Sequence, residues 1–196
     1  GMNEGGESMN AGAAGAGNRS ESDNEGNRNG TNMSTALSII EMCYGDTGLL
    51  LSMPRQGLGN SAIAAVANDE QLERFKGTWA AMAITESGCG SDSAAIRTTA
   101  IKDGDDYILN GEKIFVTSGE RADSVVVWAT LDKKLGRAAI KSFVVPKGTE
   151  GMKVERLEHK LGIKASDTAV ISFIDCRVPA ANLLGIAEVD VAEGFA

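Results

Sequence analysis

The sequence has little basic charge, a single histidine and no long apolar run. Its 196 residues contain 19 lysines and arginines against 27 aspartates and glutamates, which gives a formal net charge of −8. Nucleic acids and anionic membrane surfaces require a cationic face that displaces counterions, so this acidic balance argues against both partners. No apolar stretch approaches the roughly 18 to 20 residues that span a bilayer. We therefore expect a soluble, cytoplasmic protein without membrane insertion and without a nucleic-acid partner.

The sequence also lacks paired cysteines. Its three cysteines, Cys43, Cys89 and Cys176, are odd in number, far apart and in no C-x-x-C pair. This pattern is typical of neither a disulfide framework nor a zinc knuckle. The sequence therefore predicts free thiols in a reducing compartment and no bound metal.

The beginning of the chain lacks valine, isoleucine, leucine and aromatic side chains. Such a stretch buries too little apolar area to offset the entropy of ordering it, so residues 1–34 are predicted to be a low-complexity linker or loop. Beyond it the apolar spacing becomes helical, with one helix over about 34–45 and a helical stretch over about 61–75 whose second part begins with Asp69 as its cap. We assign residues 35–78 to part of an N-terminal helical domain.

Residues 79–185 have the pattern of a small β-domain. The turn signals at Asp103–Asp106 and Asn110–Gly111 separate short apolar runs and predict three consecutive antiparallel strands. Further strands are predicted over 124–129, 141–145, 152–157 and 169–174. The sequence therefore predicts an α+β fold in which a short helical segment packs on an antiparallel β-barrel or sandwich. Residues 186–196 have the pattern of the opening of a C-terminal helical domain.

Two pairs of reactive side chains could form a catalytic site. Cys89, flanked by two glycines, and His159, the only histidine, are the pair that a cysteine hydrolase would need. Glu86 and Asp92 could pair as an acid and a base, although carboxylates at turns commonly accept bonds from nearby backbone N–H groups. The simpler interpretation is a small thiol in a tight turn, an exposed histidine and two structural carboxylates.

The segment from Met82 to Asp92 runs from a short strand into a glycine turn rich in hydroxyl groups. Glycines let backbone N–H groups approach a ligand, and serine and threonine hydroxyls both donate and accept hydrogen bonds. One strand later, Phe115 and Thr117 lie two residues apart and therefore on the same strand face. An aromatic plane beside a hydroxyl suits a planar heteroaromatic ring, which needs stacking on one side and a hydrogen bond at its edge.

Five motifs resemble the FAD-dependent acyl-CoA dehydrogenase family. They lie within about residues 45–196 and keep the family's order and spacing, which makes the set far more specific than any single motif. The motifs are Ala83–Asp92 (AITESGCGSD), Tyr107–Lys113 (YILNGEK), Phe115–Thr117 (FVT), Leu161–Thr168 (LGIKASDT) and Asp175–Gly185 (DCRVPAANLLG). The resemblance implies the end of an N-terminal helical domain, a complete flavin-binding middle β-domain and the start of a C-terminal helical domain.

The resemblance also implies cofactor roles for residues around the glycine turn. Backbone groups of Met82 and Ile84, together with the hydroxyl and N–H of Thr85, fall where the family meets the pyrimidine edge of the flavin. Gly90 and Ser91 fall near the ribityl pyrophosphate of FAD, and the position of Ser91 also lies close to the acyl-CoA.

Two further cofactor positions follow from the FVT motif. Phe115 takes the place of an aromatic residue, often Trp, that packs near the isoalloxazine, and it keeps a stacking plane without the indole N–H. Thr117 takes the place whose hydroxyl approaches the flavin N5. Ser87 stands where the family commonly has proline, which makes the turn less rigid but is tolerated.

The activity that the resemblance implies is FAD-dependent desaturation of an acyl-CoA thioester to a trans-2-enoyl-CoA, as in fatty acid β-oxidation. The family passes its electrons to an electron-transferring flavoprotein and forms homo-oligomers. Its catalytic glutamate lies in the C-terminal domain, so we expect the base beyond residue 196, a truncated form and weak FAD retention. The alternatives are a non-catalytic module that binds FAD or acyl-CoA and, more remotely, the Cys89-dependent hydrolase.

Overall fold

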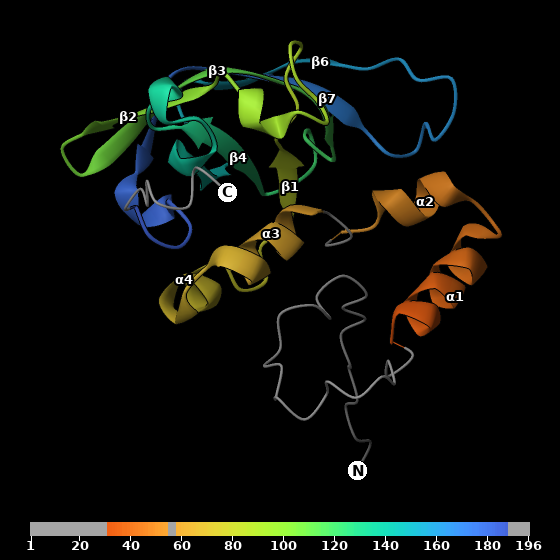
Figure 1. Ribbon diagram of the computed structural model, residues 1–196. Helices are drawn as coiled ribbons and strands as arrows, with labels where there is room; N and C mark the ends of the chain where they lie inside the picture. The colour runs from red at the N-terminus through yellow and green to blue at the C-terminus, as the bar shows by residue number, and fades with distance from the viewer. Residues whose placement is uncertain (1–30, 55–57, 188–196) are drawn as a thin grey trace.

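The computed structural model describes residues 31–54 and 58–187 (Figure 1). The predicted linker over 1–34 and the predicted helical opening over 186–196 therefore lie almost wholly outside the described residues. Helices occur over both predicted helical stretches, although the first begins at Thr31, within the predicted linker, and a short helix over residues 47–52 was not predicted. The helices are α1 (Thr31–Cys43), α2 (Thr47–Ser52), α3 (Leu58–Val66) and α4 (Asp69–Arg74).

The strands that follow form one curled sheet (Figure 1). They are β1 (Ala80–Ala83), β2 (Thr99–Asp103), β3 (Asp106–Thr117), β4 (Ser124–Thr130), β5 (Ile140–Pro146), β6 (Met152–Leu157) and β7 (Thr168–Pro179). Short 3-10 helices complete the described elements: η2 (Ser93–Ala95), η3 (Lys133–Ala139) and η4 (Ala180–Asn182). The sheet is a half-barrel preceded by short helices, which confirms the predicted α+β class.

The sheet is mixed, whereas the sequence predicted antiparallel pairing throughout. β1 runs parallel to β4, with Ala80 opposite Ser124 and Ala83 opposite Val127. Parallel neighbours need a long connection, and the chain between β1 and β4 supplies it with the β2–β3 hairpin. The long pairings of β3 with β7, β4 with β5 and β6 with β7 are antiparallel.

The predicted hairpin turn at Asn110–Gly111 is wrong, because β3 continues through both residues. β7 pairs with β3 on either side of this point, and the register shifts there in a bulge. Gly111 has a φ of 154°, and a Cβ atom there would lie 2.4 Å from the hydroxyl oxygen of Thr98. The glycine therefore marks a bulge and a close approach of two chain segments. The other predicted turn, at Asp103–Asp106, does join β2 and β3.

Two apolar clusters lie on the two faces of the sheet. β4 contributes to both, since Val125 and Val127 belong to the larger cluster and Val126 belongs to the smaller one. Helix α3 packs on the smaller cluster, below the sheet in Figure 1. A Cβ atom at Gly59 in α3 would lie 2.3 Å from the carbonyl oxygen of Ala81 in β1, so this glycine lets the two backbones touch. Burial on both faces explains why β4 reads as a continuous apolar run.

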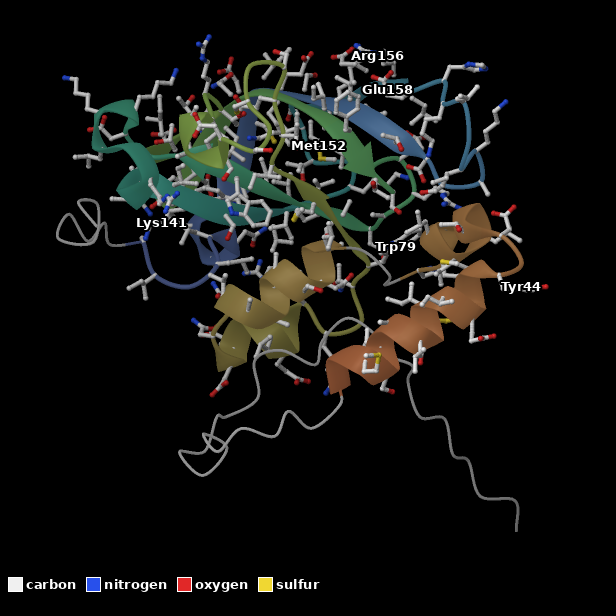
Figure 2. All side chains as sticks on the ribbon, turned by 45° about the vertical axis from the view of Figure 1, so that its right-hand side comes forward. Tyr44, Trp79, Lys141, Met152, Arg156 and Glu158 are labelled. Atoms are coloured by element: carbon white, nitrogen blue, oxygen red, sulfur yellow. The ribbon has the colours of Figure 1, made fainter. Side chains whose placement is uncertain are left out.

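Helices α1 and α2 leave most of their large apolar side chains exposed. Leu37 and Ile40 in α1 and Leu49 in α2 are examples. Tyr44, just after α1, is 92% exposed and projects away from the helix (Figure 2). No described helix combines the length and the apolarity that crossing a membrane requires.

The edge strand β6 carries charged side chains along its length. Lys153 pairs with Glu155 at 2.8 Å, and Arg156 pairs with Glu158 at 3.0 Å (Figure 2). Charges along a strand edge discourage pairing with other chains, because adding a strand there would remove these groups from water.

Helix α4 is tied to the end of the β-domain by one buried amide. Its cap is Asn68 rather than the predicted Asp69, because the Asn68 side chain accepts a bond from the Gln71 N–H. The side chain of Gln71 donates to the carbonyl of Leu183 at 2.6 Å and accepts from the N–H of Gly185 at 3.0 Å. A single side chain therefore links the helical segment to the chain that follows β7.

We expect Gln71→Ala to lower the free energy of unfolding by about 2 kcal/mol, because it leaves a buried carbonyl and a partly buried N–H without partners. Urea denaturation followed by circular dichroism measures the loss. Glu70→Gln, an exposed change in the same helix, should stay within about 0.5 kcal/mol of the unaltered chain. Equal losses in the two variants would contradict the role given to the Gln71 amide.

Candidate functional site

A buried ion pair joins the segment after β1 to the middle of β3. The Nζ atom of Lys113 lies 2.7 Å from Oε1 of Glu86, and the two side chains are 0% and 8% exposed. A buried pair of this kind is stable only when further hydrogen bonds satisfy both charges. The surrounding chain supplies those bonds.

Hydrogen-bond donors occupy both oxygens of the Glu86 carboxylate. Oε2 accepts from the N–H of Arg97 at 2.7 Å, and Oε1 accepts from the N–H and the hydroxyl of Thr98 at 2.9 and 2.6 Å. Burial alone would raise the pKa of Glu86, but the bonds from Lys113, Thr98 and Arg97 hold it below its usual value. Glu86 is therefore a structural carboxylate rather than an available general base.

The ammonium of Lys113 has a second partner, the carbonyl oxygen of Ile84 at 3.1 Å. Burial lowers the pKa of Lys113, while the bond and the charge of Glu86 act in the opposite direction. The local sequence pattern does not mark Lys113 as a buried residue, because the preceding Asn-Gly pair favours a turn. The available signal was a lysine at an inward position of a strand whose other inward residues, Tyr107, Leu109 and Val116, are apolar.

The segment after β1 lies beside the second half of β3. The carbonyl of Thr85 accepts a bond from the N–H of Ile114 at 2.9 Å, next to the bond from Lys113 to Ile84. Met82, two residues earlier, is half-buried in β1. The structure therefore brings Ile84 and Thr85 against the strand that carries the FVT motif, whereas Met82 pairs with Val126 of β4.

A bulge in β3 turns the ring of Phe115 outward. The register with β7 shifts between Lys113 and Val116, so that two residues of β3 face one residue of β7. Phe115 has a φ of 57°, which is strained for a bulky aromatic residue, and its side chain is 62% exposed. Thr117 is also exposed, whereas Val116 between them is buried. Phe115 and Thr117 therefore share one open face.

Gly90 and Ser91 lie in the turn that follows Glu86. The turn is closed by two backbone bonds, from the Glu86 N–H to the Cys89 carbonyl at 3.0 Å and from the Cys89 N–H to the Glu86 carbonyl at 3.2 Å. Gly90 and Ser91 are exposed, and a Cβ atom at Gly90 would meet open space. Within the described part of the chain no hydrogen bond joins these two residues to β3.

Residues 81–176 match the family model of the acyl-CoA dehydrogenase middle domain. The chain belongs to the acyl-CoA dehydrogenase family. It is 46% identical over 132 residues to the acryloyl-CoA reductase (NADH) of Anaerotignum propionicum, a match that covers 63% of this chain and 34% of that protein. It is 36% identical over 156 residues to the short-chain specific acyl-CoA dehydrogenase of Clostridium acetobutylicum, which covers 76% of this chain and 41% of that protein.

The fold agrees with a solved structure of the same family. Butyryl-CoA dehydrogenase from Megasphaera elsdenii superposes with a TM-score of 0.71 at 34% identity, over 79% of this chain and 42% of that one. The chain therefore spans about two fifths of the length of the relatives that it matches. Of the domains of this family, the chain covers mainly the middle domain.

Acyl-CoA dehydrogenases bind FAD, and the described face has features that fit a flavin ring. Phe115 offers an exposed aromatic plane and Thr117 an exposed hydroxyl. Among the described residues, the N–H of Thr85 has no hydrogen-bond partner, although its carbonyl is paired. Three hollows of the described surface, of about 370, 270 and 810 Å³, are lined by other residues. The candidate flavin site of this family member is thus an open face rather than an enclosed cavity.

The residues of the alternative hydrolase do not meet. Cys89 is buried in its turn, and His159 is exposed in the loop between β6 and β7. Burial raises the pKa of Cys176 to about 11, so this thiol stays protonated near neutral pH. The described part of the chain therefore contains no cysteine paired with a histidine.

We expect Lys113→Ala to destabilise the fold by about 3 to 5 kcal/mol, because it leaves the buried Glu86 carboxylate without its cation. Chemical denaturation at neutral pH measures the change. The control is Lys76→Ala, which breaks an exposed pair with Glu73 and should cost less than about 0.5 kcal/mol. A comparable loss in the control would mean that burial of the Lys113–Glu86 pair does not make its removal more destabilising than that of an exposed pair.

Acid should weaken the fold through Glu86. Because its pKa is lower in the folded than in the unfolded chain, its stabilising effect is complete at neutral pH. That effect is lost as the pH falls below about 4.3, the ordinary pKa of a glutamate, and through the lowered folded-state value. The unfolding free energy of Glu86→Gln should therefore depend less steeply on pH between neutrality and pH 3 than that of the unaltered chain. Identical pH dependence in both would contradict this assignment.

Proposed function

We propose that this chain is the flavin-binding part of an FAD-dependent acyl-CoA dehydrogenase that converts an acyl-CoA thioester to a trans-2-enoyl-CoA. The observation that carries the proposal is the open face on which Phe115 and Thr117 lie beside the backbone of Ile84 and Thr85. Membership of the acyl-CoA dehydrogenase family supports it. Because the chain spans about two fifths of its relatives, the complete reaction requires further parts of the protein.

In this proposal the chain holds the flavin ring from one side and along one edge. Phe115 packs near the isoalloxazine, and the Thr117 hydroxyl approaches N5. The hydroxyl and N–H of Thr85, with backbone groups of Ile84 and Met82, face the pyrimidine edge. Bound there, FAD would accept the hydride from the β-carbon of the acyl-CoA. The protein's own contribution is to orient the ring and to keep its hydrogen-bond donors fixed in advance.

In this proposal the turn that follows Glu86 contacts the ribityl pyrophosphate of FAD and part of the acyl-CoA. We assign Gly90 to the ribityl pyrophosphate, because a Cβ atom there would meet open space, which leaves room for phosphate oxygens to approach. We assign the exposed Ser91 hydroxyl both to that group and to the acyl-CoA. The two Glu86–Cys89 backbone bonds hold this turn in place.

The remaining components of the reaction are placed outside the described residues. Removal of the α-proton requires a base, and the carboxylate of Glu86 is already engaged by Lys113, Thr98 and Arg97. We place the base beyond residue 196. We also propose an electron-transferring flavoprotein as the electron acceptor, a homo-oligomeric complete protein and a cytoplasmic, reducing location. Related acyl-CoA dehydrogenases support the electron acceptor, and the free cysteines support the location.

A second candidate is a non-catalytic module that binds FAD or acyl-CoA. The same open face supports it, since binding needs only the groups on β1, β3 and the turn after Glu86. The engaged carboxylate of Glu86 favours this candidate if no other base reaches the face.

The first test is whether the chain binds FAD, followed by flavin absorption between 300 and 550 nm and by fluorescence titration. We expect weak, saturable binding, which Phe115→Gly should reduce about threefold to tenfold by removing the aromatic plane. The same change relieves the positive φ, so the free energy of unfolding should stay constant or rise by up to about 1 kcal/mol.

Ile101→Ala is the matched control, because Ile101 is an exposed apolar residue on β2 and should leave FAD binding unchanged. Opposite effects of Phe115→Gly on affinity and stability separate a binding role from a structural one. The proposal fails if FAD does not bind, or if Phe115→Gly binds it as well as the unaltered chain does.

Anaerobic addition of an acyl-CoA to the FAD-loaded chain distinguishes the two candidates. Bleaching of the flavin bands would establish the dehydrogenase reaction and would mean that a base reaches the open face. Flavin bands that persist while acyl-CoA binds would favour the non-catalytic module. The readout is the absorbance change near 450 nm against a control without acyl-CoA.

A further inference from the structure

We propose that Lys113, buried behind the open face, favours reduced over oxidised flavin by polarising the peptide group between Ile84 and Thr85. This inference rests on the proposed function, which places the Thr85 N–H at the pyrimidine edge of the flavin. It gives Lys113 a positioning and electrostatic role without contact between its side chain and the cofactor.

The peptide group between Ile84 and Thr85 connects the ammonium to the open face. Lys113 Nζ donates to the carbonyl oxygen of Ile84 at 3.1 Å, and the N–H of the same peptide belongs to Thr85. A cation on a carbonyl oxygen draws electron density from the amide, so its N–H becomes a stronger donor. Among the described residues that N–H has no partner, and it remains available to a ligand.

The surroundings make this polarisation effective. Lys113 is fully buried, so water does not screen its charge from the adjacent peptide group. Glu86 balances the charge at 2.7 Å and is itself held by Thr98 and Arg97. The ammonium therefore stays at one distance from the Ile84 carbonyl.

A purely structural role does not require the bond from Lys113 to Ile84. The N–H of Ile114 already attaches Thr85 to β3, and the bonds of Glu86 already attach the turn to Thr98. These bonds already position the segment after β1, so the bond from Lys113 to Ile84 adds little to its position. Its distinct effect is on the donor strength of the Thr85 N–H.

A stronger donor at the pyrimidine edge favours the reduced form of the flavin. Two electrons and one proton convert the oxidised flavin to a reduced form with a negative charge on its pyrimidine side, and the electrons come from the acyl-CoA or from an added reductant. Cooperative strengthening by about 10–30% of one hydrogen bond to a charged group corresponds to a preference of up to roughly fivefold for the reduced form. For a two-electron couple a tenfold change is about 30 mV.

The test compares two variants that weaken the same buried cluster. Lys113→Met combined with Glu86→Gln removes both charges together and leaves no unpaired ion. Thr98→Val removes the hydroxyl bond to Glu86 but keeps the ammonium on Ile84. The reduction potential of bound FAD is measured against a reference dye, and the melting temperature of each variant is recorded.

We expect the double variant to lower the flavin potential by an amount equivalent to a loss of up to roughly fivefold in the preference for reduced flavin. Thr98→Val should leave the potential unchanged despite its lower melting temperature. An unchanged potential in the double variant, or equal shifts in both variants, would overturn the inference. FAD that fails to bind the unaltered chain would instead overturn the proposed function, and this inference with it.

A second measurement needs neither flavin nor substitution. The carbonyl carbon of Ile84 in the unaltered chain should shift in carbon-detected NMR when the Lys113 ammonium loses its proton as the pH is raised, while the carbonyl carbon of Ala100 should not. An Ile84 carbonyl that ignores this titration would overturn the inference even if the double variant fails to fold. The result is independent of FAD binding, so it separates failure of the inference from failure of the proposed function.

Discussion

The buried ion pair between Lys113 and Glu86 is the interaction on which the candidate site depends. Two opposite charges taken out of water are tolerated only when every remaining donor and acceptor is satisfied. This requirement draws the end of β1, the segment before β2 and the middle of β3 to one point. Once these three segments are fixed, the backbone of Ile84 and Thr85 can lie only beside the FVT motif of β3.

The open face owes its shape to two departures of β3 from a regular strand. The bulge at Gly111 lets the strand pass the Thr98 side chain at close range, and the bulge at Phe115 turns an aromatic ring out of the core. Each departure is destabilising by itself, since one requires a glycine and the other a positive φ. The long pairing with β7 and the buried pair at Lys113 hold the strand in this form, which is how strain is commonly retained at binding sites.

Much of the fold could be predicted from short-range patterns. The helical spacing before Trp79, the Asp-Gly turn between β2 and β3 and the strands β4, β5 and β6 all appear where the sequence placed them. The Asn-Gly dipeptide at Asn110–Gly111 was misassigned, because the same residues that favour a hairpin also permit a bulge. Only the partner strand decides between these two outcomes, and β7 lies about 60 residues further along the chain.

The sequence by itself determined the class of the protein and the residue types at the site, because the order and spacing of the motifs can be recognised without knowing how the chain folds. It also placed a hydroxyl-rich glycine turn and an aromatic residue within the same domain. The tertiary structure decided that Lys113 is buried against Glu86, that Phe115 faces outward and that β1 runs parallel to β4. These features depend on contacts between segments far apart in the chain, and local propensity carries no information about such contacts.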